Sequence, residues 1–309
     1  MIGQSSESMR LPLRRSSACR LAPYVGWLIG AGALALFSSF HLFEAEVHAA
    51  PINYGSFTGN TVVYSDVRED ANSAGDSPPL FGEPITTGPV TPGYPAVPCV
   101  LCSIPGDTLA FAPTGFGASA TGAGGIDITD GNLTFKITSK PGIGISNLKL
   151  AEAGDLTMIG TGTDLTNVGV TAYGILNITE VDGVGINTIA YQFTLNFSPS
   201  GGTFGFLSDG GGGPLPYFDD WNGSLLIDVD GILAVAVANG DIPAFSLGAT
   251  KISVNLDNTL VAQSQAGTSA LIAKKDFGVS IDVNIPEPAT FVMAAIGLLS
   301  VSFGMIRRR

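Results

Sequence analysis

The sequence predicts an all-β body, an antiparallel β-sandwich or jelly-roll-like fold, flanked by an apolar N-terminal helix and a short C-terminal hydrophobic helix. Apolar and polar residues alternate with a period of two in several segments of 107–285, and turn-forming dipeptides separate these segments. No long amphipathic helix is visible, although 225–238 is apolar enough to be either a helix or a strand. Many short, half-buried strands joined by tight turns are typical of sandwiches and jelly rolls.

Residues 1–49 have the three-part order of a secretory signal. Four arginines in the first twenty residues precede an apolar run at 24–43. Val47 and Ala49 then place small side chains at the two positions that a signal peptidase reads. We expect cleavage after Ala49. The apolar run would be about 30 Å long as a helix, so an uncleaved membrane anchor is the alternative.

Residues 50–106 are expected to contain a first strand at 61–65 and then a loop rich in proline and glycine at 68–106. Cys99 and Cys102 lie in this loop, with prolines on both sides. Those prolines disfavour the helix that a reactive thiol pair needs. In an oxidising compartment the two cysteines are therefore expected to form a small local disulfide that pins the loop.

Residues 107–285 form the expected β body, as one large sandwich or two small ones. Strict alternation of apolar and polar residues predicts strands in four clear segments, and glycine-containing dipeptides predict the turns. The strands are expected at 133–138, 187–197, 252–256 and 279–283, and the turns at 130–131, 182–183, 200–202, 230–231 and 239–240.

An aromatic and acidic cluster at 217–222 is the candidate binding site of the body. Tyr217 and Trp221 offer flat faces for stacking on a sugar ring, and Asp219 and Asp220 offer acceptors for its hydroxyls. The same residues fit a simpler structural role, in which the aromatic rings close one end of the core and the acids face water. Both interpretations remain open from the sequence.

Catalytic and metal-binding patterns are weak in the body. Both histidines of the chain lie within 1–49, which leaves no histidine for a Ser-His-Asp triad, a histidine base or histidine-ligated zinc. No acidic pair has the context of a glycosidase, so we expect no enzymatic activity and no cofactor. Asp228 and Asp230 could contribute oxygen ligands to Ca²⁺, or they could be solvated residues of a turn.

The charge of the body restricts its partners. Residues 50–288 contain 7 lysines and arginines against 23 aspartates and glutamates, a net charge of 7 − 23 = −16. A surface of this sign repels nucleic acid and anionic lipid and attracts cations or basic partners. We therefore exclude a nucleic-acid-binding function.

The C-terminal segment 286–309 has three parts in a fixed order. Pro286, Glu287 and Pro288 precede an apolar stretch at 291–306, which would be about 24 Å long as a helix and is short for a membrane span. The arginines Arg307, Arg308 and Arg309 end the sequence and favour the cytoplasmic side of the membrane. This arrangement resembles a PEP-CTERM sorting signal, with a plain tail anchor as the alternative.

The resemblance to PEP-CTERM proteins implies a route and a habitat. In that family a membrane-embedded exosortase recognises and cleaves the tag, in Gram-negative bacteria that produce exopolysaccharide. The expected partners are thus signal peptidase, an exosortase-like processing enzyme, the membrane during transit, and extracellular polysaccharide. The sequence therefore predicts an exported structural protein of the cell surface or biofilm matrix, with a carbohydrate-binding module as the alternative.

Overall fold

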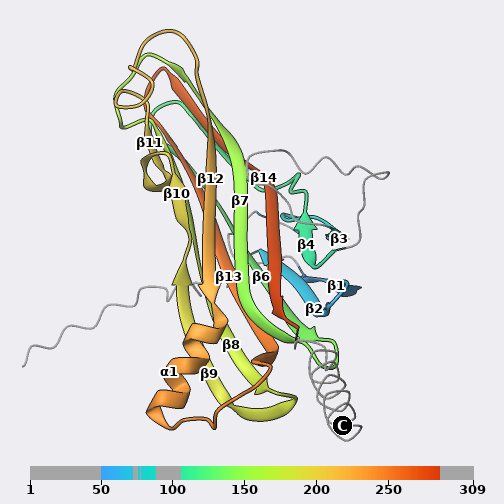
Figure 1. Ribbon diagram of the computed structural model, residues 1–309. Helices are drawn as coiled ribbons and strands as arrows, with labels where there is room; N and C mark the ends of the chain where they lie inside the picture. The colour runs from blue at the N-terminus through green and yellow to red at the C-terminus, as the bar shows by residue number, and fades with distance from the viewer. Residues whose placement is uncertain (1–49, 72–75, 77, 88–105, 286–309) are drawn as a thin grey trace, which may run out of the picture. The chain divides into compact units, whose positions relative to one another are not determined.

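The computed structural model describes residues 50–71, 76, 78–87 and 106–285, and it confirms the all-β antiparallel class (Figure 1). Fourteen strands, one α-helix and one 3₁₀ turn make up this part of the chain. The elements are β1 (Ile52–Thr58), β2 (Val62–Ala71), β3 (Ile85–Thr87), β4 (Thr108–Phe111), β5 (Gly117–Thr121), β6 (Gly125–Ser139), β7 (Gly144–Gly160), β8 (Asn167–Val181), β9 (Val184–Thr194), β10 (Asn196–Ser198), η1 (Ser200–Gly202), β11 (Thr203–Gly205), β12 (Tyr217–Asp228), α1 (Val229–Asn239), β13 (Ala249–Ser264) and β14 (Thr268–Asn284).

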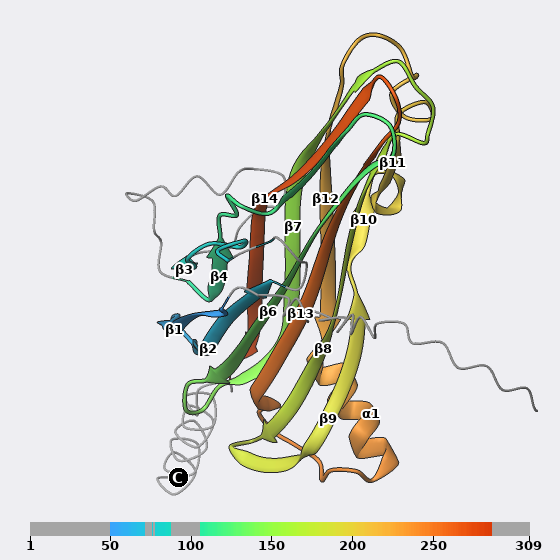
Figure 2. The ribbon, with the colours of Figure 1, turned by 180° about the vertical axis from the view of Figure 1, so that it is seen from behind.

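The strands form one hydrogen-bonded network that folds into two facing layers. The first layer has the order β1-β2-β6-β13-β8-β9, and Figure 2 shows it toward the viewer. The second has the order β3-β4-β14-β7-β12-β10 and faces the viewer in Figure 1. The layers share one strand pairing at Ala249 and Ile145. Short strands extend both layers: β5 pairs with β14 and β11 pairs with β8.

The core lies between the layers because each long strand has one apolar side. In β13 the side chains of Ile252, Val254 and Leu256 are fully buried, whereas the alternate residues Ser253 and Asn255 face outward. Each large apolar side chain that is buried in this way contributes about 1.5–3 kcal/mol. In β13 the period-two pattern therefore fixes which side of the strand faces the core.

Some predicted boundaries differ from the structure. Asp130 and Gly131 are not a turn but lie inside β6, because this strand has hydrogen-bonded neighbours on both sides, β2 and β13. A Cβ at Gly131 would come within 2.9 Å of both Leu80 and Phe116, so close packing explains the glycine. Strand β1 precedes the predicted first strand. The predicted loop 68–106 includes the end of β2 and all of β3.

The ambiguous segment 225–238 divides into the end of β12 and helix α1. Asp228 is the N-cap residue, and its Oδ1 accepts a hydrogen bond from the backbone N–H of Gly231 at 2.8 Å. Gly240 ends the helix in the left-handed conformation, with φ of 79°. The predicted turns at 230–231 and 239–240 are therefore the first turn and the end of a helix. Val229, Leu233 and Ala236 are the buried residues of α1.

In the described part of the chain, no helix is both long and apolar enough to cross a membrane. The two terminal helices expected from the sequence lie outside the described residues.

Candidate functional site

A polar surface covers the outward side of four neighbouring strands, β6, β13, β8 and β9. Strand register places Asn132, Asp257, Tyr173 and Thr194 side by side in one row across these strands. The next row on the same side contains Thr134, Asn255, Ile175 and Gln192. We call these two rows the polar face. Most of its members line an open hollow of about 700 Å³.

Hydrogen bonds between strands hold the side chains of the polar face in place. The amide nitrogen of Asn132 donates to Oδ1 of Asn255 at 2.6 Å. The hydroxyl of Tyr173 donates to Oδ2 of Asp257 at 2.9 Å. This hydrogen bond to a carboxylate raises the pKa of the Tyr173 phenol, so the phenol stays neutral. The ring of Tyr173 is 54% exposed, and its orientation is fixed at the hydroxyl end.

The chemistry of the polar face is that of recognition. It offers amide, hydroxyl and carboxylate groups, which can donate to and accept from the hydroxyls of a polar ligand. Tyr173 adds an amphipathic ring, and Ile175 adds an exposed apolar side chain beside it. Sequence reasoning did not single out this surface. The outward alternation in 252–256 was visible, but the partners of Asn255 follow only from strand register.

The predicted cluster at 217–221 is divided between the two sides of β12. Trp221 faces the core, is 1% exposed, and packs edge-on against Phe197 with ring centroids 6.0 Å apart. Tyr217 and Asp219 share its side of the strand, and the Tyr217 hydroxyl donates to Oδ2 of Asp219 at 2.7 Å. Asp220 points outward. The indole face of Trp221 is therefore not available to stack on a sugar. This burial agrees with the alternative interpretation of the cluster, in which the aromatic ring belongs to the core.

A second, smaller hollow lies on the outward side of β7, β12 and β14. Its volume is about 460 Å³, and Phe218, Asp220 and Lys275 are among its lining residues. Phe218 is 67% exposed. Asp155 lies directly across from Asp220 in the strand register, and Lys275 forms an ion pair with Asp155 at 3.4 Å. This cation offsets the repulsion that two facing carboxylates would otherwise produce.

Both candidate calcium ligands have partners in the protein. Asp228 caps α1, and Oδ2 of Asp230 accepts a hydrogen bond from the amide of Asn284 at 2.7 Å. Among the residues that the structure describes, no three histidine, cysteine, aspartate or glutamate side chains are grouped as a metal site would need.

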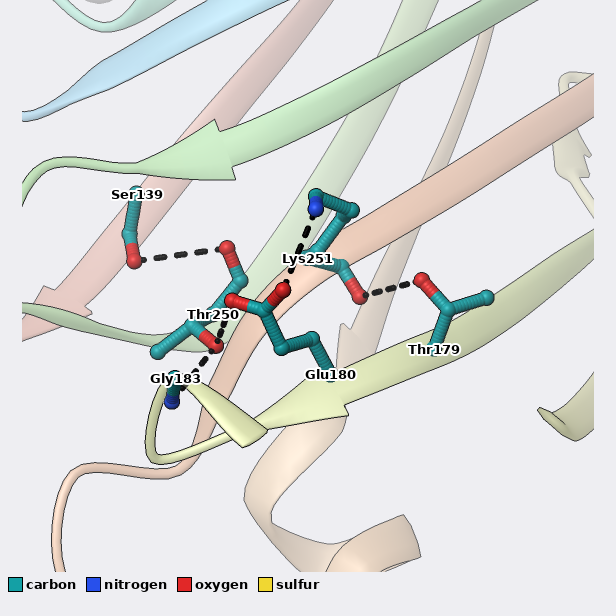
Figure 3. A network of polar contacts seen from close by, with 6 residues as sticks. All are labelled: Ser139, Thr179, Glu180, Gly183, Thr250 and Lys251. Carbon is teal, nitrogen blue, oxygen red and sulfur yellow. Dashed lines mark hydrogen bonds and ion pairs between the residues drawn. The ribbon is translucent and has the colours of Figure 1, made fainter. Parts of the chain in front are cut away.

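A polar network fixes the end of β13 nearest α1 (Figure 3). Lys251 and Glu180 form an ion pair at 3.1 Å, and the hydroxyl of Thr250 donates to the other carboxylate oxygen at 2.9 Å. The backbone N–H of Gly183 donates in turn to the Thr250 hydroxyl at 3.1 Å. The ion pair to Lys251 and the hydrogen bond from Thr250 lower the pKa of Glu180. This network lies where β13 changes register against β8.

The terminal sites and the cysteine pair predicted from the sequence lie outside the described residues. They are Val47, Ala49, Cys99, Cys102, Pro286, Glu287, Pro288, Arg307, Arg308 and Arg309.

Comparison with solved structures gives only faint likenesses. The enzymatically active domain of tailspike protein 4 from bacteriophage CBA120 is 11% identical, with 54% of this chain and 19% of that chain covered and a TM-score of 0.15. The D431N mutant of the VP2 protein of infectious bursal disease virus is 9% identical, with 76% and 57% covered and a TM-score of 0.09. This chain thus spans less than two thirds of either protein. Both scores are too low to support an inference.

Comparison with curated proteins finds no match. A family model described as the PEP-CTERM protein-sorting motif matches residues 284–309. This match confirms the resemblance noted for the three-part C-terminal segment, and the motif implies export and processing by an exosortase. The chain therefore carries a PEP-CTERM protein-sorting motif at residues 284–309, and this motif implies an exported protein that is sorted by an exosortase.

Proposed function

We propose that the β body is a non-enzymatic structural module of the cell surface or extracellular polysaccharide matrix of a Gram-negative-type bacterium. The observation that supports this most directly is the polar face, where amide, hydroxyl and carboxylate side chains from four paired strands share one side of the sheet. Such groups exchange hydrogen bonds with water and with sugar hydroxyls alike. The acidic body also gathers cations from its surroundings.

The location is tested by the intact mass of the protein recovered from the envelope, the matrix and the medium of its host. A matrix or surface protein should carry a mass that matches a chain from Ala50 to near Pro288, with any attached group. A mass that retains 291–309 would make the tail a plain anchor. A chain that remains entirely in the cytoplasm would contradict the proposal.

A second candidate function, carbohydrate binding, is favoured by the hollow on the polar face. Tyr173 places an exposed ring beside the acceptors of Asn255 and Asp257, and the hollow of about 700 Å³ is open to a polymer chain. Pockets that orient small ligands combine apolar contact with a few fixed polar groups. In this proposal the polar face takes the role that the sequence suggested for Trp221.

The binding function is tested by titrating the purified full chain with exopolysaccharide from its host. Tyr173→Ala and Asn255→Ala should each weaken binding about tenfold, the equivalent of about 1.4 kcal/mol. Phe218→Ala, an exposed aromatic on the other layer, is the matched control and should leave this binding unchanged. Equal affinity in all four proteins would show that the binding site lies outside the polar face. If none of the four proteins binds the polysaccharide, only the structural proposal would remain.

A further inference from the structure

Three polar side chains from three strands meet inside the apolar core. Glu152 on β7, Asn258 on β13 and Lys274 on β14 are 1%, 0% and 1% exposed. Each lies on the inward side of its strand, at a position in line with buried apolar residues. In β13, for example, the inward neighbours of Asn258 are Leu256 and Leu260, both fully buried. Charged side chains are almost never fully buried unless they are paired, and buried amide groups need hydrogen-bond partners.

The two nitrogen donors of this cluster bind the same oxygen atom. The amide Nδ2 of Asn258 donates to Oε2 of Glu152 at 2.7 Å, and Nζ of Lys274 also donates to Oε2. The other two oxygens, Oε1 of Glu152 and Oδ1 of Asn258, are buried and have no hydrogen-bond partner among the described residues. An unpaired buried acceptor is costly. The hydrogen bonding of the cluster is therefore incomplete, because two of its oxygens lack donors. The carboxylate of Glu152 nevertheless holds the Lys274 amine and the Asn258 amide next to each other.

Aromatic rings surround the amine of Lys274. The ring centroids of Phe116, Phe81 and Phe277 lie 4.6, 5.0 and 5.6 Å from Nζ. Burial lowers the pKa of Lys274, and the attraction to Glu152 opposes this shift without reversing it. Desolvation in an apolar pocket is one way in which a lysine becomes a nucleophile, because it favours the neutral amine.

We propose that Lys274 and Asn258 become joined by an isopeptide bond that forms within the folded chain, with Glu152 as the catalytic acid and base. Glu152 takes a proton from the Lys274 ammonium, and the neutral Nζ attacks Cγ of Asn258. The bond from Cγ to Nζ forms and the bond from Cγ to Nδ2 breaks. Glu152 relays a proton from the attacking nitrogen to the leaving one, which departs as ammonia.

The reaction is balanced without an oxidant, a reductant or a co-reactant. An ammonium, a carboxylate and a primary amide become a secondary amide, a neutral carboxylic acid and ammonia. As a donor, the neutral acid can satisfy the amide oxygen of residue 258, which has no partner before the reaction.

The fold supplies the positioning that this reaction needs. Glu152 lies 106 residues from Asn258 and 122 from Lys274 in the sequence, so the three groups meet only after the strands have paired. Fixing reactants in this way replaces a rare encounter by a unimolecular step. Asn258 belongs to the first layer and Lys274 to the second. The bond therefore cross-links the two layers through the core, which suits a module that must persist outside the cell.

A peptide map of the full chain tests the bond. Trypsin cuts after Lys251 and Lys275, so a single segment, 252–275, contains both partners. We expect this segment to be lighter than its sequence by one ammonia and to resist cutting after Lys274. A second protease that cuts after Leu260 or Leu271 should then leave the two pieces joined. A segment of full mass would overturn the proposal. So would a lighter segment whose pieces separate, because an asparagine that closes to a succinimide also loses ammonia.

Matched variants test the roles of the residues. Lys274→Arg keeps the charge but removes the nucleophile and should restore the full mass, whereas Lys275→Arg on the exposed neighbour should keep the loss of ammonia. Glu152→Gln should fold, as judged by circular dichroism, and show the full mass. A bond that still forms in Glu152→Gln would overturn the role of Glu152. If a core variant does not fold, the map of the unaltered chain still decides whether the bond exists.

Discussion

Trp221 on β12 packs edge-on against Phe197 on β10 and is almost completely buried. The contact adds to the pairing of β10 with β12 at the edge of the second layer, where Phe197 lies across from Gly223 in the strand register. The single tryptophan of the described body thus contributes to the core.

Trp221→Ala should lower the free energy of unfolding by about 3–5 kcal/mol, because it removes a large side chain from the core and leaves a cavity. Urea denaturation followed by circular dichroism measures the change. Phe218→Ala, on the exposed side of the same strand, is the control and should change stability by less than about 0.5 kcal/mol. Similar small effects in both variants would contradict a core role for Trp221.

Gly154→Ala should be destabilising by about 1–3 kcal/mol through overpacking. A Cβ at this position would lie 2.0 Å from the carbonyl oxygen of Ala273 and 2.5 Å from the Trp221 ring. Gly185→Ala is the matched change on the edge strand β9, where a Cβ meets nothing within 4 Å. It should be neutral or stabilise by up to about 1 kcal/mol, because alanine restricts the unfolded chain. Thermal unfolding of the two variants in parallel checks the difference in sign.

The ion pair of Glu180 and Lys251 should make stability depend on pH in the acid range. The folded state lowers the pKa of Glu180 below its ordinary value of 4.5. Its contribution is therefore complete above pH 4.5 and is lost as the pH falls through the lower pKa of the folded state. Both side chains are partly exposed, so we expect at most about 1 kcal/mol.

Glu180→Gln measures this contribution. The variant should be less stable than the unaltered protein at neutral pH, and the gap should close as the pH falls below 4.5. Denaturant titrations at several pH values provide the test. A gap that is the same at pH 7 and pH 3 would show that the carboxylate charge does not stabilise the fold.

Asp182 should stabilise the connection between the β8–β9 turn and the segment after α1. Burial acts to raise the pKa of Asp182, but hydrogen bonds from the backbone N–H groups of Ser246, Leu247 and Gly248 outweigh it, and the pKa is lowered. Asp182→Asn should cost about 1 kcal/mol, because it replaces the charged acceptor by a neutral one.

Asp182→Ala should cost more than Asp182→Asn. Residue 182 has a φ of 53°, a left-handed conformation that asparagine tolerates better than alanine. Chemical denaturation of the two variants compares the costs. Equal losses would mean that neither the conformation nor the remaining amide acceptor matters at this position.

Much of the fold was predictable from local patterns. The alternation at 133–138, 252–256 and 279–283 gave the correct strands, because one side of each strand is buried and the other is not. Turn dipeptides were less reliable. Asp182 and Gly183 form a turn, whereas Asp130 and Gly131 continue a strand that has partners on both sides. A dipeptide records local conformational preference, and strand pairing can override it.

The two surfaces with chemical interest were less predictable. The polar face combines residues of four strands. The cluster at 217–221 was a candidate site only because its members are adjacent in the sequence. The signal of the buried cluster was present: Glu152, Asn258 and Lys274 each interrupt an apolar side of an alternating strand. Alternation shows that these side chains point inward, but it does not show that they point at each other.

The sequence by itself determined the route of this protein and the strand class of its body. A sorting motif is read as a short linear segment by another protein, and alternation is a property of neighbouring residues, so neither needs the folded chain. Only the tertiary structure decided that Trp221 is buried, that Tyr173 meets Asp257, and that Lys274 and Asn258 share the carboxylate of Glu152. The physical reason is strand register, which is set by pairing between segments far apart in the chain and brings together groups that no local pattern connects.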